Sequence, residues 1–103
     1  MAPSFKTGFG PFYLFNGTEG RLTCNAEAAP RPSEYKWYNG TTLLTSSPRY
    51  RIEHGEFSTL IIDNVEKNQD EGPYTCYAKN SLGHAEATAN ATVFSENYIC
   101  SLY

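Results

Sequence analysis

The chain is short, acidic and rich in aromatic residues: it has 103 residues, a net charge of −3 and 15% Phe, Trp and Tyr. This length suffices for one domain and not for two, and the composition is that of a folded globule. The charge argues against a nucleic-acid surface built on clustered Lys and Arg. Because no long apolar run is present, we expect no direct membrane insertion. Met1-Ala2-Pro3 looks like a start codon placed before a domain excised from a longer protein.

Short strands are expected in the amino-terminal quarter. Ser4-Phe5-Lys6 is the first, and the glycines and proline of residues 7–11 break it. Phe12-Tyr13-Leu14-Phe15 resumes as a strand and ends at the turn signal Asn16-Gly17. Residues 21–26 then alternate between two faces, as a half-buried strand does. The inward set is Leu22, Cys24 and Ala26.

The middle of the chain predicts four more short strands and two turns. Residues 35–38 form the next strand, and Asn39-Gly40 turns it. Residues 42–44 form at most a short edge strand. Residues 50–53 and 58–62 are expected to pair as a hairpin across residues 54–56. The expected core residues here are Tyr35, Trp37, Leu60, Ile62 and Val65.

The last third predicts a long hairpin around the turn Asn80-Ser81-Leu82-Gly83. Its first strand should point Tyr74, Cys76 and Ala78 inward. Its second, residues 84–94, should point Ala85, Ala87, Ala89, Ala91 and Val93 inward. Four alanines make a thin face, which should lie close against its neighbour or be underfilled. Residues 95–103 fall outside this pattern.

The stretch Asp70-Glu71-Gly72-Pro73-Tyr74-Thr75-Cys76 organises the chain, together with Cys24 and Trp37 upstream. A buried cysteine pair, a Trp packed on it and a Tyr two residues before the second Cys mark an immunoglobulin-type sandwich. Tyr74 can bury its ring while its hydroxyl bonds the backbone of the preceding corner. Asp70 and Gly72 suit that corner, because Asp bonds local N–H groups and Gly tolerates a positive φ.

From about Pro3 to Phe94 the chain resembles an I-set immunoglobulin domain of a neural cell-adhesion molecule. Its ending Ala85-Glu86-Ala87-Thr88 and the run Ala28-Ala29-Pro30 are most similar to the fifth immunoglobulin domain of the contactins; neurofascin-like and Down syndrome cell adhesion molecule-like proteins stay as alternatives. The other matching stretches are Gly20-Arg21-Leu22-Thr23-Cys24, Pro30-Arg31-Pro32, Trp37-Tyr38-Asn39-Gly40, Leu60-Ile61-Ile62, Asp70 to Cys76, and Ala78-Lys79-Asn80 with Gly83.

The resemblance implies an all-β fold: a two-sheet antiparallel Greek-key sandwich over residues 4–94, followed by a tail or linker over residues 95–103. Pro73 departs from the pattern, because a Pro forfeits a ladder N–H and is tolerated at the first residue of a strand. The tail Glu96-Asn97-Tyr98-Ile99-Cys100 departs as well, since it matches no linker of the family.

The fold implies a disulfide between Cys24 and Cys76, with Trp37, Asp70, Gly72 and Tyr74 in structural roles. The bridge closes a loop of about 50 residues, worth roughly 4 kcal/mol, and persists in oxidising compartments. Cys100 is left over. The alternative is a cytosolic relative with both thiols reduced.

Three Asn-X-Thr sequons begin at Asn16, Asn39 and Asn90. They accept glycans only in a secreted chain. We expect glycans at Asn39 and Asn90 before Asn16, and the alternative for each is an unmodified asparagine. A glycan at Asn90 would block edge-to-edge pairing of the sandwich.

An outward patch of Lys36, Tyr38, Tyr77 and Lys79 is the candidate interface, because aromatic residues are enriched in interface cores. The alternative is ordinary cross-strand packing on a solvated face, and a glycan at Asn90 would crowd the same sheet. Arg49 or Arg51 could reach Asp70 and hold one end of the fold. This contact would be structural.

No pattern points to catalysis, a cofactor or a metal. His54 and His84 lie far apart, without a second ligand at metal spacing, and no Gly-rich phosphate loop is present.

The resemblance implies a non-catalytic, extracellular module at the cell surface, part of a larger membrane-attached protein. Its partners would be cell-surface proteins, homophilic or heterophilic, and neighbouring immunoglobulin domains. The alternatives are a cytoplasmic structural module of a muscle or actin-associated protein and a receptor fragment that binds a growth factor.

Overall fold

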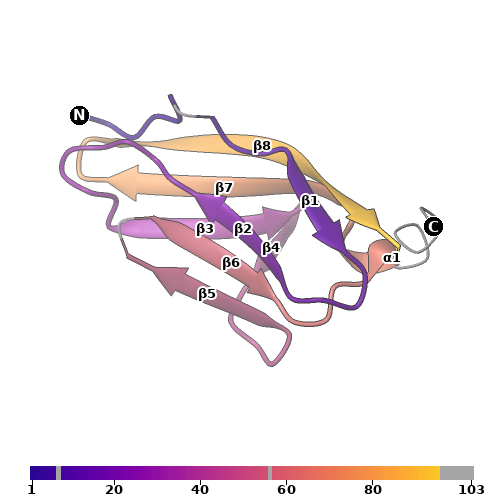
Figure 1. Cartoon of the computed structure of the whole chain (residues 1–103). Coiled ribbons are helices and arrows are strands. Elements are labelled where there is room, and N and C mark those ends of the chain that lie inside the picture. The colour runs from indigo at the N-terminus through magenta and orange to yellow at the C-terminus, as the bar shows by residue number, and fades with distance from the viewer. Residues whose placement is uncertain (7, 56, 96–103) are drawn as a thin grey trace.

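The computed structural model describes residues 1–6, 8–55 and 57–95, which fold into two stacked β-sheets. Figure 1 shows the strands running along the length of the molecule, with the amino terminus and the end of β8 at opposite ends. The elements are β1 Phe12–Phe15, β2 Gly20–Cys24, β3 Glu34–Asn39, β4 Thr42–Leu44, β5 Tyr50–His54, β6 Ser58–Ile62, α1 Lys67–Asp70, β7 Gly72–Asn80 and β8 Gly83–Phe94.

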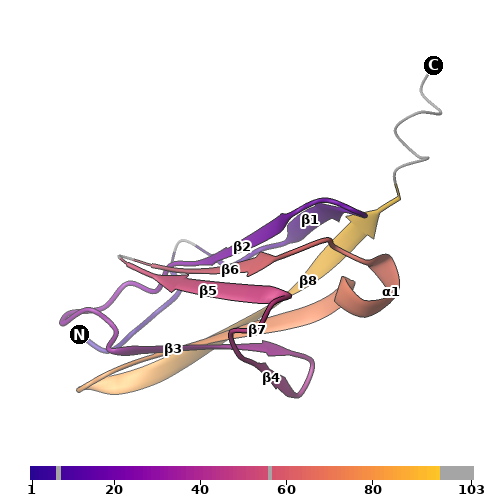
Figure 2. The same ribbon diagram turned by 90° about the horizontal axis from the view of Figure 1, so that it is seen from below.

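Five strands form one sheet in the order β1-β8-β7-β3-β4, and three form the other in the order β2-β6-β5. Figure 2 shows the two sheets as layers seen along their edges. The predicted all-β sandwich is confirmed. One pairing differs from the antiparallel rule, because β1 runs parallel to β8.

The amino-terminal segment differs from the strand predicted over Ser4 to Lys6. Ser4 to Lys6 forms a single bridge, between Ser4 and Glu27, instead of a strand. The glycines and proline that follow let the chain leave the neighbourhood of β2 and cross to β8. The residues before the break therefore pair just beyond the end of β2, and those after it pair with β8.

Period-two alternation decides which side chains fill the core. In β2 and β7 every second residue is buried, which follows from the alternating direction of side chains along a strand. In β6 three consecutive residues are buried, Leu60, Ile61 and Ile62. The core cluster comprises Leu14, Leu22, Cys24, Trp37, Leu44, Leu60, Ile62, Val65, Tyr74, Cys76, Ala91 and Val93.

The alanine face of β8 is only partly covered. Ala91 is 2% exposed and Val93 is fully buried, whereas Ala85, Ala87 and Ala89 are half-buried between exposed neighbours. The predicted inward alternation is present, and the face is underfilled over these three residues. The amino-terminal segment passes close to this face: a Cβ at Gly10 would lie 2.4 Å from the Cβ of Ala89. The small side chains of β8 therefore make room for the crossing chain.

Pro73 lies in β7 at the second residue, one position later than the sequence predicts. Its carbonyl oxygen accepts from the N–H of Gly40, 2.9 Å away, in the turn that follows β3. Because the N–H and C=O of one residue point to the same side of a strand, the missing N–H of Pro73 faces this turn. No ladder bond is lost, since the pairing with β3 ends at Tyr74.

Candidate functional site

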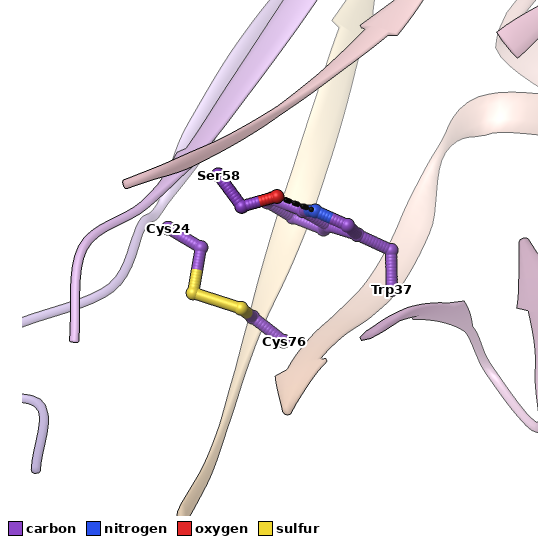
Figure 3. The surroundings of a disulfide bond; sticks show 4 residues. All are labelled: Cys24, Trp37, Ser58 and Cys76. Carbon is purple, nitrogen blue, oxygen red and sulfur yellow. Dashed lines mark hydrogen bonds between the residues drawn. A yellow bond between two sulfur atoms is a disulfide. The ribbon is translucent and has the colours of Figure 1, made fainter. Parts of the chain in front are cut away.

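A disulfide joins the two sheets at the centre of the sandwich. Cys24 of β2 and Cys76 of β7 are bonded across a Cα–Cα distance of 6.3 Å, and both are fully buried. Figure 3 shows the bridge beside the ring of Trp37. The third cysteine, Cys100, lies outside the described residues.

A hydrogen bond runs parallel to the disulfide. The indole Nε1 of Trp37 donates to Oγ of Ser58, 2.9 Å away (Figure 3). Trp37 pairs with Cys76 in one sheet and Ser58 pairs with Cys24 in the other, so the two links lie side by side. Sequence reasoning missed Ser58, although it falls in phase with the buried Leu60 and Ile62.

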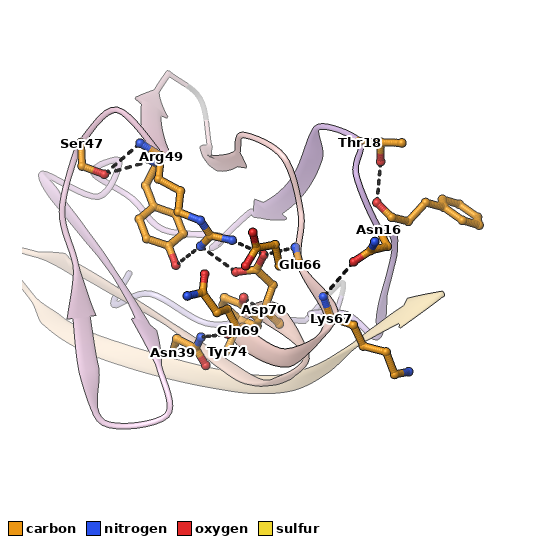
Figure 4. A network of polar contacts seen from close by, with 12 residues as sticks. Asn16, Thr18, Asn39, Ser47, Arg49, Glu66, Lys67, Gln69, Asp70 and Tyr74 are labelled. Atoms are coloured by element: carbon orange, nitrogen blue, oxygen red, sulfur yellow. Dashed lines mark hydrogen bonds and ion pairs between the residues drawn. The ribbon is translucent and has the colours of Figure 1, made fainter. Parts of the chain in front are cut away.

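The corner before β7 is held by Tyr74 and Asp70 (Figure 4). The hydroxyl of the fully buried Tyr74 donates to the carbonyl oxygen of Asp70, 2.7 Å away. A carboxylate oxygen of Asp70 accepts from the N–H of Glu66 at 2.7 Å, which holds the single turn of α1. Burial raises the pKa of Tyr74, and the nearby carboxylate of Asp70 adds to the rise. Gly72 has a φ of +137°, which favours glycine.

Arg49 is the cation that balances the buried carboxylate of Asp70. Its Nη1 lies 2.9 Å from Oδ1 of Asp70, and its Nη2 contacts the other oxygen, so the pair is bidentate (Figure 4). The hydrogen bond to Asp70 raises the pKa of Arg49. Arg51 lies elsewhere, 3.7 Å from Glu19 and 3.7 Å from Glu53. The structure therefore selects Arg49 for this ion pair.

The three sequon asparagines lie in different surroundings. Asn90 is exposed on β8. Asn16 is exposed as well, and its Oδ1 accepts from the N–H of Lys67 at 3.1 Å. Asn39 is half-buried, and its Nδ2 donates to the carbonyl oxygen of Gln69 at 3.3 Å (Figure 4). The nitrogen that would carry a glycan is thus engaged at Asn39.

The four candidate interface residues share the outer face, which is the side of the five-stranded sheet turned away from the other sheet. Lys36 is directly opposite Tyr77, and Tyr38 is opposite Thr75. The ammonium of Lys36 lies 5.4 Å from the centroid of the Tyr77 ring. Lys79 occupies the next outward position along β7. Lys36, Tyr38, Tyr77 and Lys79, named here the tyrosine patch, therefore form one continuous surface.

Two residues missed at the sequence level extend this surface. The ring of His84 stacks on Tyr77, with centroids 5.4 Å apart. Leu43 of β4 is opposite Tyr38 and 48% exposed. Both follow from strand register, which composition and local pattern do not reveal.

A second aromatic cluster occupies the other end of the outer face. The ring of Phe94 lies 6.2 Å from that of Tyr13 and 5.8 Å from that of Phe15. Tyr13 is 62% exposed and Phe15 is 43% exposed. Asn90 lies on β8 between this cluster and the tyrosine patch, because strand positions are ordered along the sheet.

One hollow of the surface, of about 360 Å³, is lined by residues without a carboxylate, imidazole or thiol: Asn39, Thr42, Leu43, Leu44, Thr45, Ser47 and Tyr50. Two other hollows share His54, which has Glu34 beside it in one and Glu53 in the other. Among the described residues no three His, Cys, Asp or Glu side chains gather as a metal site would require. Within the same residues, no helix is long and apolar enough to cross a membrane.

Comparisons with known proteins agree with this architecture. The sequence profile of the immunoglobulin I-set domain matches residues 3–93. Contactin-1a of Danio rerio is 37% identical over 94 residues, which cover 89% of this chain and 9% of that protein. Contactin-1 of Homo sapiens is 34% identical over 95 residues, covering 90% of this chain and 9% of that protein.

Solved structures of titin share the same sandwich. One of them superposes with a TM-score of 0.81 at 28% identity, covering 92% of this chain and 49% of that chain. The chain thus spans less than a tenth of the contactins that it matches. On the profile match and these identities, the chain belongs to the immunoglobulin I-set domain family, and its predicted similarity to the contactins is confirmed.

Proposed function

We propose that the chain is a non-catalytic, extracellular module of a cell-adhesion protein. It recognises another cell-surface protein through its outer face and spaces the domains on either side of it. The contactin similarity over about nine-tenths of the chain supports this proposal. The observation that carries it is the Cys24–Cys76 disulfide in the core, because such bridges persist in oxidising compartments and are rare in the cytosol.

The sequons add support of a different kind. Asn16 and Asn90 are exposed, so a glycan at either would project into solvent. A glycan at Asn39 would keep one amide hydrogen for its bond to Gln69. We propose Asn90 as the first acceptor, followed by Asn16, with residues 4–94 as the folded unit that carries them.

A second candidate is a cytoplasmic structural module of a muscle or actin-associated protein. The TM-score of 0.81 with titin favours it. This candidate requires reduced cysteines and bare asparagines, whereas the first requires a closed bridge and at least one glycan. The two proposals therefore differ in covalent state.

The test is the intact mass of the chain secreted from animal cells behind an added signal peptide. The mass is compared with and without glycosidase, and after thiol alkylation with and without reduction. The adhesion proposal expects glycan mass and one blocked cysteine pair, and N16Q, N39Q and N90Q assign each glycan. A bare chain with every cysteine alkylatable without reduction would overturn it and favour the cytoplasmic module.

A further inference from the structure

We propose that the outer face binds a second copy of this chain around a two-fold axis that runs along β7. The inference rests on the proposed function, because it names the partner of the tyrosine patch. The arrangement of charged side chains around Tyr77 carries it.

Strand register places those side chains in rows across the sheet. The row through Tyr77 has Glu86 of β8 on one side and Lys36 of β3 on the other. The next row has Lys79 at its centre, with His84 on the β8 side and Glu34 on the β3 side. Each row thus has different charges to the left and right of β7.

A half-turn about an axis along β7 exchanges the β8 side of one copy with the β3 side of the other. Glu86 then faces Lys36 of the second copy, and Tyr77 faces its own counterpart. Since a two-fold contact repeats each pair, the row makes two opposite-charge pairs around a tyrosine pair. The other possible two-fold axis lies in the contact plane, crosses the strands and passes through Tyr77. It would place Glu86 of one copy against Glu86 of the other. Charge complementarity therefore selects the axis along β7.

This axis also suits the geometry of the sheets. It keeps the strands of the two copies in nearly the same direction, and aligned sheets pack face to face within about 30° of each other. The side chains at the centre are already held in place. The centroid of the Tyr77 ring lies 5.4 Å from the ammonium of Lys36 and 5.4 Å from the centroid of the His84 ring. Such preorganisation lowers the entropy cost of binding.

One contact in this arrangement is unfavourable. Lys79 lies on the axis and faces Lys79 of the second copy, because it occupies the central position of its row. Like charges opposed across an interface oppose association. The arrangement therefore predicts that removing the charge of Lys79 strengthens the association of two copies, whereas removing that of Lys36 weakens it, although both lysines belong to the tyrosine patch.

The area limits how tightly two copies can bind. Three strands, β8, β7 and β3, at a spacing of about 4.8 Å and with roughly six residues each at about 3.4 Å, give a contact of roughly 300 Å² per copy. A stable interface needs about 800 Å² per partner. Beyond Thr88 the next outward residue of β8 is Asn90, so a glycan there would stop the contact from spreading toward Tyr13. The association is consequently weak and acts through many copies on one surface.

The test is sedimentation equilibrium of the chain without glycan and with Cys100→Ser, which removes any dimer linked through that thiol. Concentrations reach about 1 mM, where a Kd near this value populates the dimer. We expect a monomer–dimer equilibrium that Glu86→Lys and Lys36→Glu each weaken about tenfold or more. The double variant carries the reversed pair and should restore the affinity. Lys79→Ala should strengthen it.

Matched controls come from the other sheet. Arg51 and Glu53 of β5 form an exposed pair at 3.7 Å, so Arg51→Glu and Glu53→Lys reverse similar charges away from the outer face and should leave the dimer unchanged. A chain that stays monomeric at the highest concentration would overturn the inference, as would a double variant no tighter than its parents. The proposed function would survive that outcome if the same chain is secreted with a closed bridge and glycan, so the two failures are distinguishable.

Discussion

The indole N–H of Trp37 donates to the hydroxyl of Ser58 across the two sheets, 2.9 Å from nitrogen to oxygen, and both residues are fully buried. A buried indole needs an acceptor, because an unpaired donor in a dry interior keeps its full desolvation cost. Ser58 supplies that acceptor from β6, beside the disulfide. Two neighbouring links therefore connect the sheets through the core: the disulfide, which is covalent, and the hydrogen bond from Trp37 to Ser58.

Replacing Ser58 by Ala tests how much the hydrogen bond from Trp37 contributes to stability. We expect the free energy of unfolding to fall by about 1–3 kcal/mol, because the indole N–H loses its partner without gaining water. Urea denaturation of the oxidised chain measures the change. Ser46→Ala, at an exposed position, is the control. An unchanged midpoint for Ser58→Ala would show that the bond contributes nothing to stability.

The sequence predicts the central residues because they are fixed by period and spacing. Trp37, Tyr74 and the two cysteines fall in phase with apolar neighbours and at the separations that the sandwich requires. What could not be predicted depends on contacts between distant segments. The parallel pairing of β1 with β8, and with it the contact of Tyr13 with Phe94, is set by where the crossing chain lands.

Two points that the sequence leaves open have the same physical reason. Ala85, Ala87 and Ala89 alternate correctly, yet alternation does not show whether an opposing sheet is long enough to cover them. Arg49 and Arg51 are equivalent in sequence, and the structure separates them because Arg49 precedes β5 while Arg51 lies within it. Period assigns a face to a residue, whereas register and strand length decide what lies opposite.

The ion pair between Arg49 and Asp70 should be essential for stability. Asp70 has no exposed side-chain surface, whereas that of Arg49 is 28% exposed. Arg49→Met leaves the carboxylate of Asp70 buried without its cation, so we expect a loss of about 3 kcal/mol. Arg51→Met is the matched control, since its partners are exposed, and should cost less than about 1 kcal/mol. Thermal unfolding of both variants measures the difference. Equal effects would contradict the assignment.

The disulfide should stabilise the folded domain by lowering the conformational entropy of the unfolded chain. Cys24 and Cys76 are separated by 52 positions, and closing a loop of this size stabilises a domain by about 4 kcal/mol. We expect the double variant Cys24→Ala, Cys76→Ala to lose about that amount. Guanidinium denaturation gives the value, and far-ultraviolet circular dichroism shows whether the sandwich persists. A loss well under 1 kcal/mol would indicate that the bridge is dispensable, as the cytoplasmic alternative requires.

The close approach of Gly10 to β8 predicts a steric effect. Gly10 has a φ of +68°, and a Cβ there would meet the Cβ of Ala89 at 2.4 Å. Gly10→Ala should destabilise by about 1–3 kcal/mol through overpacking, in addition to the strain of a positive φ. Gly17→Ala has only the strain, since its φ is +82° and nothing lies within 4 Å. The difference between the two midpoints in urea isolates the contact, and identical midpoints would argue that the crossing segment yields freely.

Tyr74 predicts how stability changes at alkaline pH. Burial raises its pKa in the folded chain, while in the unfolded chain the pKa stays near about 10. Below that value the tyrosine is protonated in both states and its contribution is complete. As the pH rises above it, the unfolded chain releases the proton first, so stability falls until the pH passes the raised pKa of the folded state.

Tyr74→Phe should remove that alkaline loss. The variant is less stable at neutral pH by about 1 kcal/mol, because the bond to the Asp70 carbonyl is gone. Its free energy of unfolding should then change less between about pH 9 and 11 than that of the parent chain. Tyr13→Phe, at a position 62% exposed, should retain the parent slope. A parent-like slope in Tyr74→Phe would show that the alkaline loss comes from another group.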